Sequence, residues 1–171
     1  CIRDRLDEVR TALGHLDNSF SKTFTQAYRR MDDWLQGEDS GAGAPKAPAF
    51  IRLGSWIAGD RDGNPNVTAS ITRQAVAQAA DRVLSELETR SRGVGLSLTL
   101  DERYTPPNEK LTALWNRYRQ LSEELTTTAA EHSPREPHRQ VMLAIAGRVE
   151  ATRQRDADLA YAVPPAVSYT H

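Results

Sequence analysis

The sequence contains little cysteine and little lysine, and each shortage narrows the possible functions. Cys1 is the only cysteine among 171 residues, so an internal disulfide and a cysteine-based zinc site are both excluded. Only Lys22, Lys46 and Lys110 are lysines, and the remaining basic residues are arginines interspersed with acids. Arginine suits phosphate recognition, but codon bias is the favoured explanation because the arginines are not clustered. The net charge of -1 gives no reason to expect binding to nucleic acid or to an anionic membrane.

Long hydrophobic runs are also missing. No stretch approaches the roughly 20 apolar residues that a membrane span needs, and nothing resembles a signal peptide. The sequence begins without Met, inside a helical pattern. We therefore expect residues 1–171 to be a single partial domain, an internal piece of a longer cytoplasmic protein with no membrane partner. The chain is long enough to bury a core of its own.

The first segment predicts a long amphipathic helix. Its apolar residues recur at three- and four-residue steps, and Gly37 ends the pattern. A flexible loop is expected over 38–49. A stripe of this kind can form a coiled-coil seam, but its aromatic residues favour the broader contact of a helix in a bundle. The stripe comprises Leu6, Val9, Leu13, Leu16, Phe20, Phe24, Tyr28, Met31 and Leu35.

Three further helices are predicted. The second is capped by Asn66 or Thr68 and ends within 90–95, and the third is capped by Asn108. The fourth begins at the capping box 133–136, with proline at the first helical position. Their apolar faces comprise Val67, Ile71, Ala75, Ala79, Val83 and Leu87, then Leu111, Leu114, Trp115, Tyr118, Leu121 and Leu125, and finally Val141, Ile145 and Val149.

One segment is typical of a buried strand. Residues 50–57 are short, apolar and bounded by proline and glycine. A lone strand cannot satisfy its own backbone groups, so its partners are expected outside these residues or in another chain. Residues 96–100 predict either a short strand or an irregular connection. The tail, 165–171, has no periodicity and need not be native.

A charged turn follows the predicted strand. In an α/β barrel, active sites are built from the loops that follow the strands. Gly59 and Gly63 permit unusual backbone conformations and close approach of a ligand. Trp56 offers an apolar wall where water must be excluded. The fold class expected is thus mainly α, a helix-rich fragment of a TIM-type α/β barrel with one strand near 50–57.

Arg61 is flanked by two acids in this turn. Asp60 or Asp62 can fix the direction of its guanidinium and leave the remaining donors for an anion. The same three residues also suit a purely structural ion-pair clasp, with Trp56 in an ordinary core. The chemistry of these residues alone leaves both alternatives open.

The segment "RLGSWIAGDRDGNPNVTASITR", 52–73, resembles the tryptophan-containing Gly-Asp-Arg-Asp-Gly-Asn-Pro motif of phosphoenolpyruvate carboxylase. A weaker match, "EPHRQVMLAIAGRVEATR", 136–153, is similar to a later helix of that family. The resemblance extends to about Pro164. Ala58 departs from the family's usual glycine, and Ile57 often appears there as Met or Val.

This resemblance implies a lyase that fixes carbon dioxide. The family converts phosphoenolpyruvate and bicarbonate to oxaloacetate and phosphate, which feeds the tricarboxylic acid cycle. It is a helix-rich barrel enzyme, cytoplasmic, allosteric and commonly a homotetramer, and it uses Mg²⁺ or Mn²⁺ bound by ligands outside this chain. Trp56 matches the tryptophan that lines an apolar part of the pocket. The resemblance places the active-site mouth at Asp60, Arg61 and Asp62, and substrate contacts or turn positions at Arg61, Gly59, Gly63, Asn64 and Asn66.

Several family motifs are absent from this sequence. The Thr-Ala-His-Pro segment with the catalytic His, the catalytic Lys, the metal-binding carboxylates and the Gly-rich mobile loop do not occur. The chain alone is therefore not expected to be active. The alternative from a different class is a non-catalytic helical interaction module whose stripe over 6–35 binds a partner helix.

Overall fold

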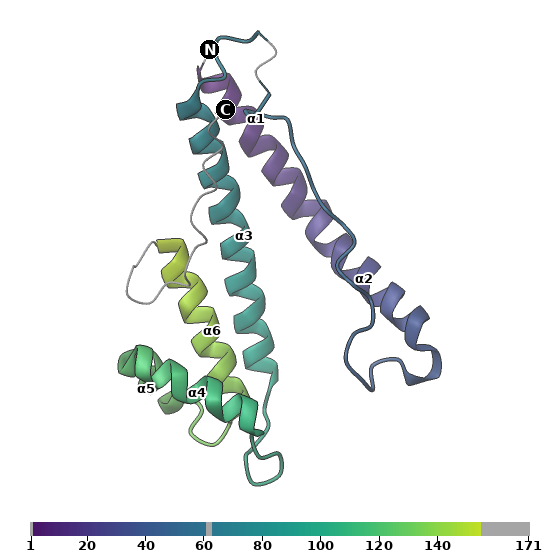
Figure 1. Cartoon of the computed structure of the whole chain (residues 1–171), viewed down its shortest axis with the longest axis vertical. Helices are drawn as coiled ribbons and strands as arrows, with labels where there is room; N and C mark the ends of the chain where they lie inside the picture. The colour runs from purple at the N-terminus through teal and green to yellow at the C-terminus, as the bar shows by residue number, and fades with distance from the viewer. Residues whose placement is uncertain (1, 61–62, 155–171) are drawn as a thin grey trace. The chain divides into compact units, whose positions relative to one another are not determined.

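The computed structural model describes residues 2–60 and 63–154, and this part of the chain is mainly helical (Figure 1). Its elements are α1 (Ile2–His15), the π-helix η1 (Leu16–Phe20), α2 (Ser21–Gln36), the 3-10 helix η2 (Gly37–Asp39), α3 (Ala69–Ser97), α4 (Glu109–Leu121), α5 (Glu123–His132) and α6 (Pro137–Gln154). Helices thus account for all the regular structure in the described residues. The predicted tail over 165–171 lies outside them.

The chain divides into two compact units, one up to Ala79 and one from Ala80 onward. The first turns of α3 belong to the first unit and the rest of α3 to the second. The prediction of one partial domain over 1–171 stays a prediction. None of the helices in the described part combines the length and the apolar character that a membrane span requires.

The first predicted helix is present, but a π turn interrupts it. Gly37 ends α2 with a φ of 62°, and its N–H bonds to the carbonyl of Asp33, as the sequence predicts for a terminating glycine. The i→i+5 bonding of η1 rotates the apolar positions after it relative to those before it. The predicted stripe is buried at Val9 but 38% exposed at Met31 and 41% at Leu35.

The strand predicted at 50–57 is not seen in this structure. Residues 45–56 carry no helix or strand, and 57–59 form a turn. The segment returns alongside α2, where side chains satisfy backbone donors that a strand would give to a neighbour. The phenol oxygen of Tyr28 accepts from the N–H groups of Phe50 and Ile51, both at 2.9 Å. With no neighbouring strand in the described chain, no ladder forms.

Asp32 of α2 holds the start of the same segment. Its Oδ1 accepts from the N–H groups of Lys46, at 2.5 Å, and Ala47, at 3.0 Å. These bonds, the one from Ala47 foremost, lower the pKa of the Asp32 carboxyl from its usual value. The ring of Tyr28 also lies 4.7 Å from that of Phe50, centroid to centroid. The connection after α2 is therefore anchored at both ends.

The core of the first unit lies between α1 and the beginning of α3. Thr68 caps α3, since its hydroxyl accepts from the N–H of Ile71 at 3.3 Å. Asn66, the alternative cap, instead donates its N–H to Asn64 Oδ1 at 3.0 Å. The buried cluster consists of Val9, Ala58, Ile71 and Ala75, with Leu6, Leu13 and Ile57 packed against it.

The second helix continues beyond its predicted end within 90–95. α3 extends to Ser97, past both Gly93 and Gly95. A Cβ on Gly95 would lie 3.2 Å from Met142 Cβ of α6, so the missing side chain lets the two helices approach closely. This glycine has a packing role and does not stop the helix. Residues 98–100 form an irregular connection, which was one of the two alternatives.

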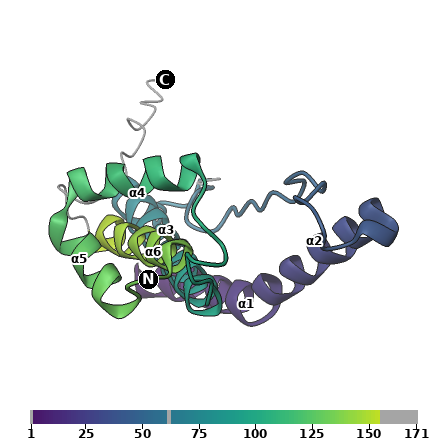
Figure 2. The same cartoon turned by 90° about the horizontal axis from the view of Figure 1, so that it is seen from below.

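The third predicted helix is divided in two. Asn108 caps α4 as predicted, with its Oδ1 accepting from Leu111 N–H at 2.9 Å. α4 ends at Leu121, and Ser122 caps α5 by accepting from Leu125 N–H at 3.2 Å. Leu121 is 40% exposed and does not join the predicted inward face. α4, α5 and α6 lie against one another in this unit (Figure 2). The core of the unit comprises Tyr118, Val141 and Ala144, with Leu111, Leu114, Trp115, Leu125 and Ile145 around it.

The capping box predicted at 133–136 is wrong. Ser133 ends α5 and Glu136 precedes α6, so proline does occupy the first position of the last helix, but it is Pro137. The side-chain amide of Gln140 donates to the carbonyl of Ser133 at 2.6 Å. Residue 137 is proline, which has no N–H to give to the Ser133 carbonyl, so a helix starting at Pro134 would lack its first backbone bond.

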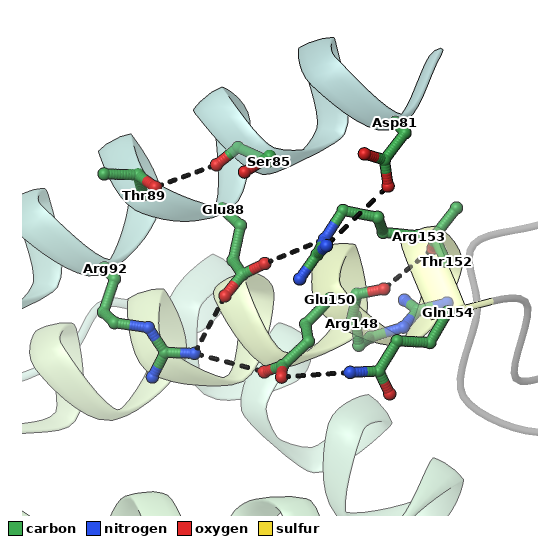
Figure 3. A network of polar contacts seen from close by, with 10 residues as sticks. All are labelled: Asp81, Ser85, Glu88, Thr89, Arg92, Arg148, Glu150, Thr152, Arg153 and Gln154. Atoms are coloured by element: carbon green, nitrogen blue, oxygen red, sulfur yellow. Dashed lines mark hydrogen bonds and ion pairs between the residues drawn. The ribbon is translucent and has the colours of Figure 1, made fainter. Parts of the chain in front are cut away.

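Charged side chains join α3 to α6 (Figure 3). Glu88 lies between Arg92 and Arg153, at 3.4 Å from a guanidinium nitrogen of each. Arg92 also reaches Glu150 at 3.2 Å. The contact between Glu88 and Arg153 is an ion pair, because its geometry does not meet that of a hydrogen bond. Partly exposed pairs of this kind contribute little individually, but together they favour one register of the two helices.

Candidate functional site

The motif tryptophan sits on a tight turn. The carbonyl of Trp56 accepts from the N–H groups of Gly59 and Asp60, both at 3.0 Å, and Ile57 N–H bonds to the Ser55 hydroxyl at 3.1 Å. Trp56 is 76% exposed. In the described part of the chain the turn therefore presents the indole outward.

Ala58 fixes the turn to the core of the first unit. It is 3% exposed, and its φ of 60° makes it the only non-glycine residue with a positive φ among those described. Thr72 of α3 donates its hydroxyl hydrogen to the Ala58 carbonyl at 2.7 Å. The unusual φ expected at Gly59 thus occurs one residue earlier, at Ala58.

The second half of the motif is a separate turn. Gly63 has a φ of 73°, as expected for a glycine needed by the backbone. Asn64 accepts from the Asn66 N–H through its side chain, and from the Val67 N–H at 3.2 Å through its carbonyl. Asp60 is exposed. Arg61 and Asp62 lie outside the described residues, so the structure does not address the predicted acid–arginine arrangement.

A shallow depression lies beside Trp56, with a volume of about 770 Å³. Two of its polar side chains are acidic, Asp7 and Glu8, and Asp7 pairs with Arg10 at 3.0 Å. The lining residues include no lysine or arginine, so a guanidinium or ammonium group that binds a phosphate or carboxylate here must come from another residue. The lining residues are Asp7, Glu8, Thr11, Ala12, His15, Trp56 and Ile57.

An apolar cavity of about 220 Å³ lies on the other side of the turn. α1, the turn and the start of α3 each contribute to its wall. The turn therefore lies between the shallow depression and the apolar cavity, and Trp56 lines the depression. The cavity is lined by Val9, Ala12, Leu13, Leu16, Ser55, Ile57, Ala58, Gly59, Thr72, Ala75, Val76 and Ala79.

A hollow of about 500 Å³ in the second unit is lined by two arginines, both already paired. Arg139 donates to the carbonyls of Gly95 and Leu96 at 3.1 and 3.0 Å, and it pairs with Glu136 at 2.7 Å. Arg92 is committed to Glu88 and Glu150. These contacts are structural, and the motif turn remains the stronger candidate for a functional site.

The described residues do not fit a metal centre. Within 2–60 and 63–154, no group of three or more His, Cys, Asp or Glu side chains could hold a metal ion.

Sequence reasoning missed the residues that hold the site. Thr72 follows Thr68 by one helical turn, a spacing that predicts only a bond within the helix. Its bond to Ala58 depends on the placement of the turn against α3. Tyr28 was predicted only as part of an apolar stripe. Nothing in that pattern indicates that its hydroxyl oxygen accepts hydrogen bonds from the N–H groups of Phe50 and Ile51.

The comparisons with known proteins agree on one family. The family model described as phosphoenolpyruvate carboxylase matches residues 3–170. The chain is similar to enzymes of that name from Azorhizobium caulinodans, at 36% identity over 90% of the chain, and Azoarcus sp., at 32% over 86%. The enzyme of Ralstonia nicotianae is 31% identical over 96% of the chain.

The chain spans about 15% of the length of these curated relatives: 16% for Azorhizobium and Ralstonia and 15% for Azoarcus. No solved structure matches it.

Proposed function

Because this chain belongs to the phosphoenolpyruvate carboxylase family, we propose that it is part of an enzyme that makes oxaloacetate and phosphate from phosphoenolpyruvate and bicarbonate. The exposed indole of Trp56, held on a turn with a buried base, is the observation that carries the proposal for this segment. In that enzyme the turn forms part of the active-site mouth.

The reaction explains why the mouth needs an apolar wall. The phosphoryl group passes from the enol oxygen of phosphoenolpyruvate to a bicarbonate oxygen, giving carboxyphosphate and the enolate of pyruvate. Carboxyphosphate loses carbon dioxide and leaves phosphate, and the enolate carbon forms the new carbon–carbon bond. If carbon dioxide escapes, the enolate takes a proton and pyruvate results. Trp56 keeps water away from the enolate and slows that escape.

The charged residues of the turn complete the mouth. Arg61 directs its planar guanidinium to a carboxylate or phosphate oxygen, and Asp60 or Asp62 fixes its direction. This assignment is supported by the depression beside Trp56, whose lining residues include no lysine or arginine. Gly59, Gly63, Asn64 and Asn66 shape the backbone close to the substrate.

Residues 50–57 form a barrel strand once the rest of the enzyme supplies neighbours. The support is their exposure, because Phe50, Leu53 and Trp56 are 50%, 58% and 76% exposed. Large apolar side chains along an irregular segment are what a buried strand presents when its neighbours are missing. The barrel of the parent enzyme is TIM-type.

The remaining properties of the proposed enzyme follow from the family. It uses a divalent metal, Mg²⁺ or Mn²⁺, which supplies positive charge for the transferring phosphoryl group and the enolate. The described residues here serve the apolar wall and the turn, and we place the metal ligands in other parts of the enzyme. We place the enzyme in the cytoplasm as an allosteric homotetramer.

The test is a product assay on the complete enzyme. Given phosphoenolpyruvate, ¹³C-bicarbonate and Mg²⁺, it should release phosphate and labelled oxaloacetate in equal amounts, with the oxaloacetate trapped by malate dehydrogenase and NADH. Residues 1–171 alone serve as the control and should give no product. Product without label, or no consumption of phosphoenolpyruvate, contradicts the proposal.

A further inference from the structure

The Trp56 turn is stabilised within itself, but few contacts fix it to the rest of the molecule. The hydrogen bonds from Gly59, Asp60 and Ile57 all join residues of the same short segment. They set the shape of the turn and not its position. Position comes from Ala58, whose side chain is buried against Val9, Ile71 and Ala75.

Thr72 supplies the directed contact at this point. Its hydroxyl oxygen lies 2.7 Å from the Ala58 carbonyl and 3.3 Å from the carbonyl of Thr68, one helical turn back. A hydroxyl has a single hydrogen to donate. The shorter distance therefore assigns that hydrogen to Ala58, and the bond joins the turn to α3.

The backbone at Ala58 has to be held in place. A φ of 60° is unfavourable for a residue with a Cβ, and it persists only where the surroundings determine it. The Thr72 bond acts on the carbonyl of this very residue. Without it, Ala58 can relax toward ordinary backbone angles, and the direction of the adjacent Trp56 changes with it.

We propose that Thr72 is a positioning residue for carboxylation, because its hydroxyl fixes the Ala58 carbonyl and thereby holds the Trp56 indole over the reacting groups. This inference rests on the proposed function. Thr72 does not touch substrate. A displaced indole leaves phosphoryl transfer intact and lets carbon dioxide escape, so phosphate is released with pyruvate in place of oxaloacetate.

The experiment measures the ratio of pyruvate to oxaloacetate that the complete enzyme forms. Thr72→Val keeps the shape of the side chain and removes the hydroxyl, so the ratio of pyruvate to oxaloacetate should rise about fivefold, the factor that matches the loss of one neutral hydrogen bond. Thr72→Ser keeps the hydroxyl and should restore the wild-type ratio. Loss of stability alone lowers the amount of active enzyme and leaves this ratio unchanged.

Thr89→Val is the matched control. Thr89 lies on the same helix, and its hydroxyl donates only to the Ser85 carbonyl one turn back, at 2.9 Å. This variant loses a bond within the helix and should keep the wild-type ratio. If Thr72→Val does not fold, Thr72→Ala compared with Thr72→Ser makes the same test.

The outcomes separate the inference from the proposed function. Wild-type enzyme that makes no oxaloacetate overturns the proposed function. If wild type makes oxaloacetate and Thr72→Val shows the same ratio, only the role of Thr72 is overturned. An equal rise in Thr72→Val and Thr72→Ser also overturns it, since the hydroxyl would then not be the group that matters.

Discussion

Ala58 shows how one residue can satisfy conflicting demands. The backbone needs a positive φ at this position, which favours glycine, but the core beneath needs a methyl group, which only a side chain provides. Alanine provides the smallest side chain that fills the space.

We expect Ala58→Gly to change local stability very little. The relief of about 1–2 kcal/mol of backbone strain offsets the loss of a buried methyl, about 0.8 kcal/mol, and the greater freedom of the unfolded chain, about 0.4–1 kcal/mol. Ala75→Gly is the matched comparison, because Ala75 is also buried but lies within α3. That change should cost about 2 kcal/mol through the same methyl and a lower helix propensity.

Amide hydrogen exchange across 56–75 measures both effects. Faster exchange by more than about tenfold in Ala75→Gly, with exchange close to wild type in Ala58→Gly, is the expected result. Equal losses at both positions would mean that the φ of Ala58 carries no strain.

Asp101 gives the second unit a dependence on pH. Its carboxylate accepts from the Arg103 side chain and N–H, with Arg135 3.6 Å away, and these contacts lower its pKa from 3.8 to about 2. Because the folded pKa is the lower one, the stabilisation is complete above about pH 4 and is lost as the pH falls through 2. The connection between α3 and α4 should therefore loosen over that range.

Hydrogen exchange over 98–108 as a function of pH, corrected for the intrinsic exchange rate, checks this expectation. Asp101→Asn should open this connection already at neutral pH and remove the acid-dependent change. Asp39→Asn, on η2 in the other unit, is the control and should leave the profile unchanged. A profile that is the same in wild type and Asp101→Asn would contradict the assignment.

At the scale of the helices, two glycines of α3 make a direct test of packing. A Cβ at Gly93 meets nothing within 4 Å, whereas one at Gly95 would lie 3.2 Å from Met142 Cβ. Gly93→Ala should therefore stabilise α3 by about 1 kcal/mol through helix propensity. Gly95→Ala should gain less or lose stability, since α6 must move to admit the methyl.

Local exchange rates within α3 distinguish the two variants. Slower exchange in Gly93→Ala and no such slowing in Gly95→Ala are expected. If both substitutions stabilise the helix equally, the close approach of α3 and α6 at Gly95 is wrong.

The helices were largely predictable because their order rests on apolar periodicity and on caps. Gly37, Thr68 and Asn108 act as the sequence indicates. The predicted helix boundaries were wrong where the same residue pattern can either begin or end a helix, or can serve packing. Gly95 resembles a stop but serves close packing, and Ser133 resembles a cap but ends the preceding helix. Tertiary contacts decide such cases, and they are not visible in the spacing of residues.

The prediction of a strand over 50–57 was wrong for a different reason. Its sequence pattern is intact, but a strand is a relation between neighbours, and here Tyr28 takes up two of its backbone donors. The exposed Val83 and Leu87 of α3 follow the same logic, since their stripe was predicted from periodicity and is 67% and 50% exposed.

At the scale of the whole molecule, the sequence predicted which residues belong to the candidate site. It did not predict how those residues are placed in space. The residues around Trp56 identified the family and the turn, because a rare combination of residue types carries that information. The placement of the turn by Ala58 and Thr72 depends on residues 14 apart in sequence, and no local pattern specifies it. Arg61 and Asp62 remain predictions from the sequence.

The most direct test of the account compares two tryptophans in the complete enzyme. Trp34 of α2 is 77% exposed and Trp56 is 76% exposed, so the pair is matched in residue type and exposure. The measurement is the ratio of pyruvate to oxaloacetate formed from phosphoenolpyruvate and bicarbonate. Trp56→Ala should raise this ratio about tenfold or more, and Trp34→Ala should leave it at the wild-type value. An unchanged ratio in Trp56→Ala, or an equal rise in both variants, would contradict the claim that the Trp56 turn borders the carboxylation site.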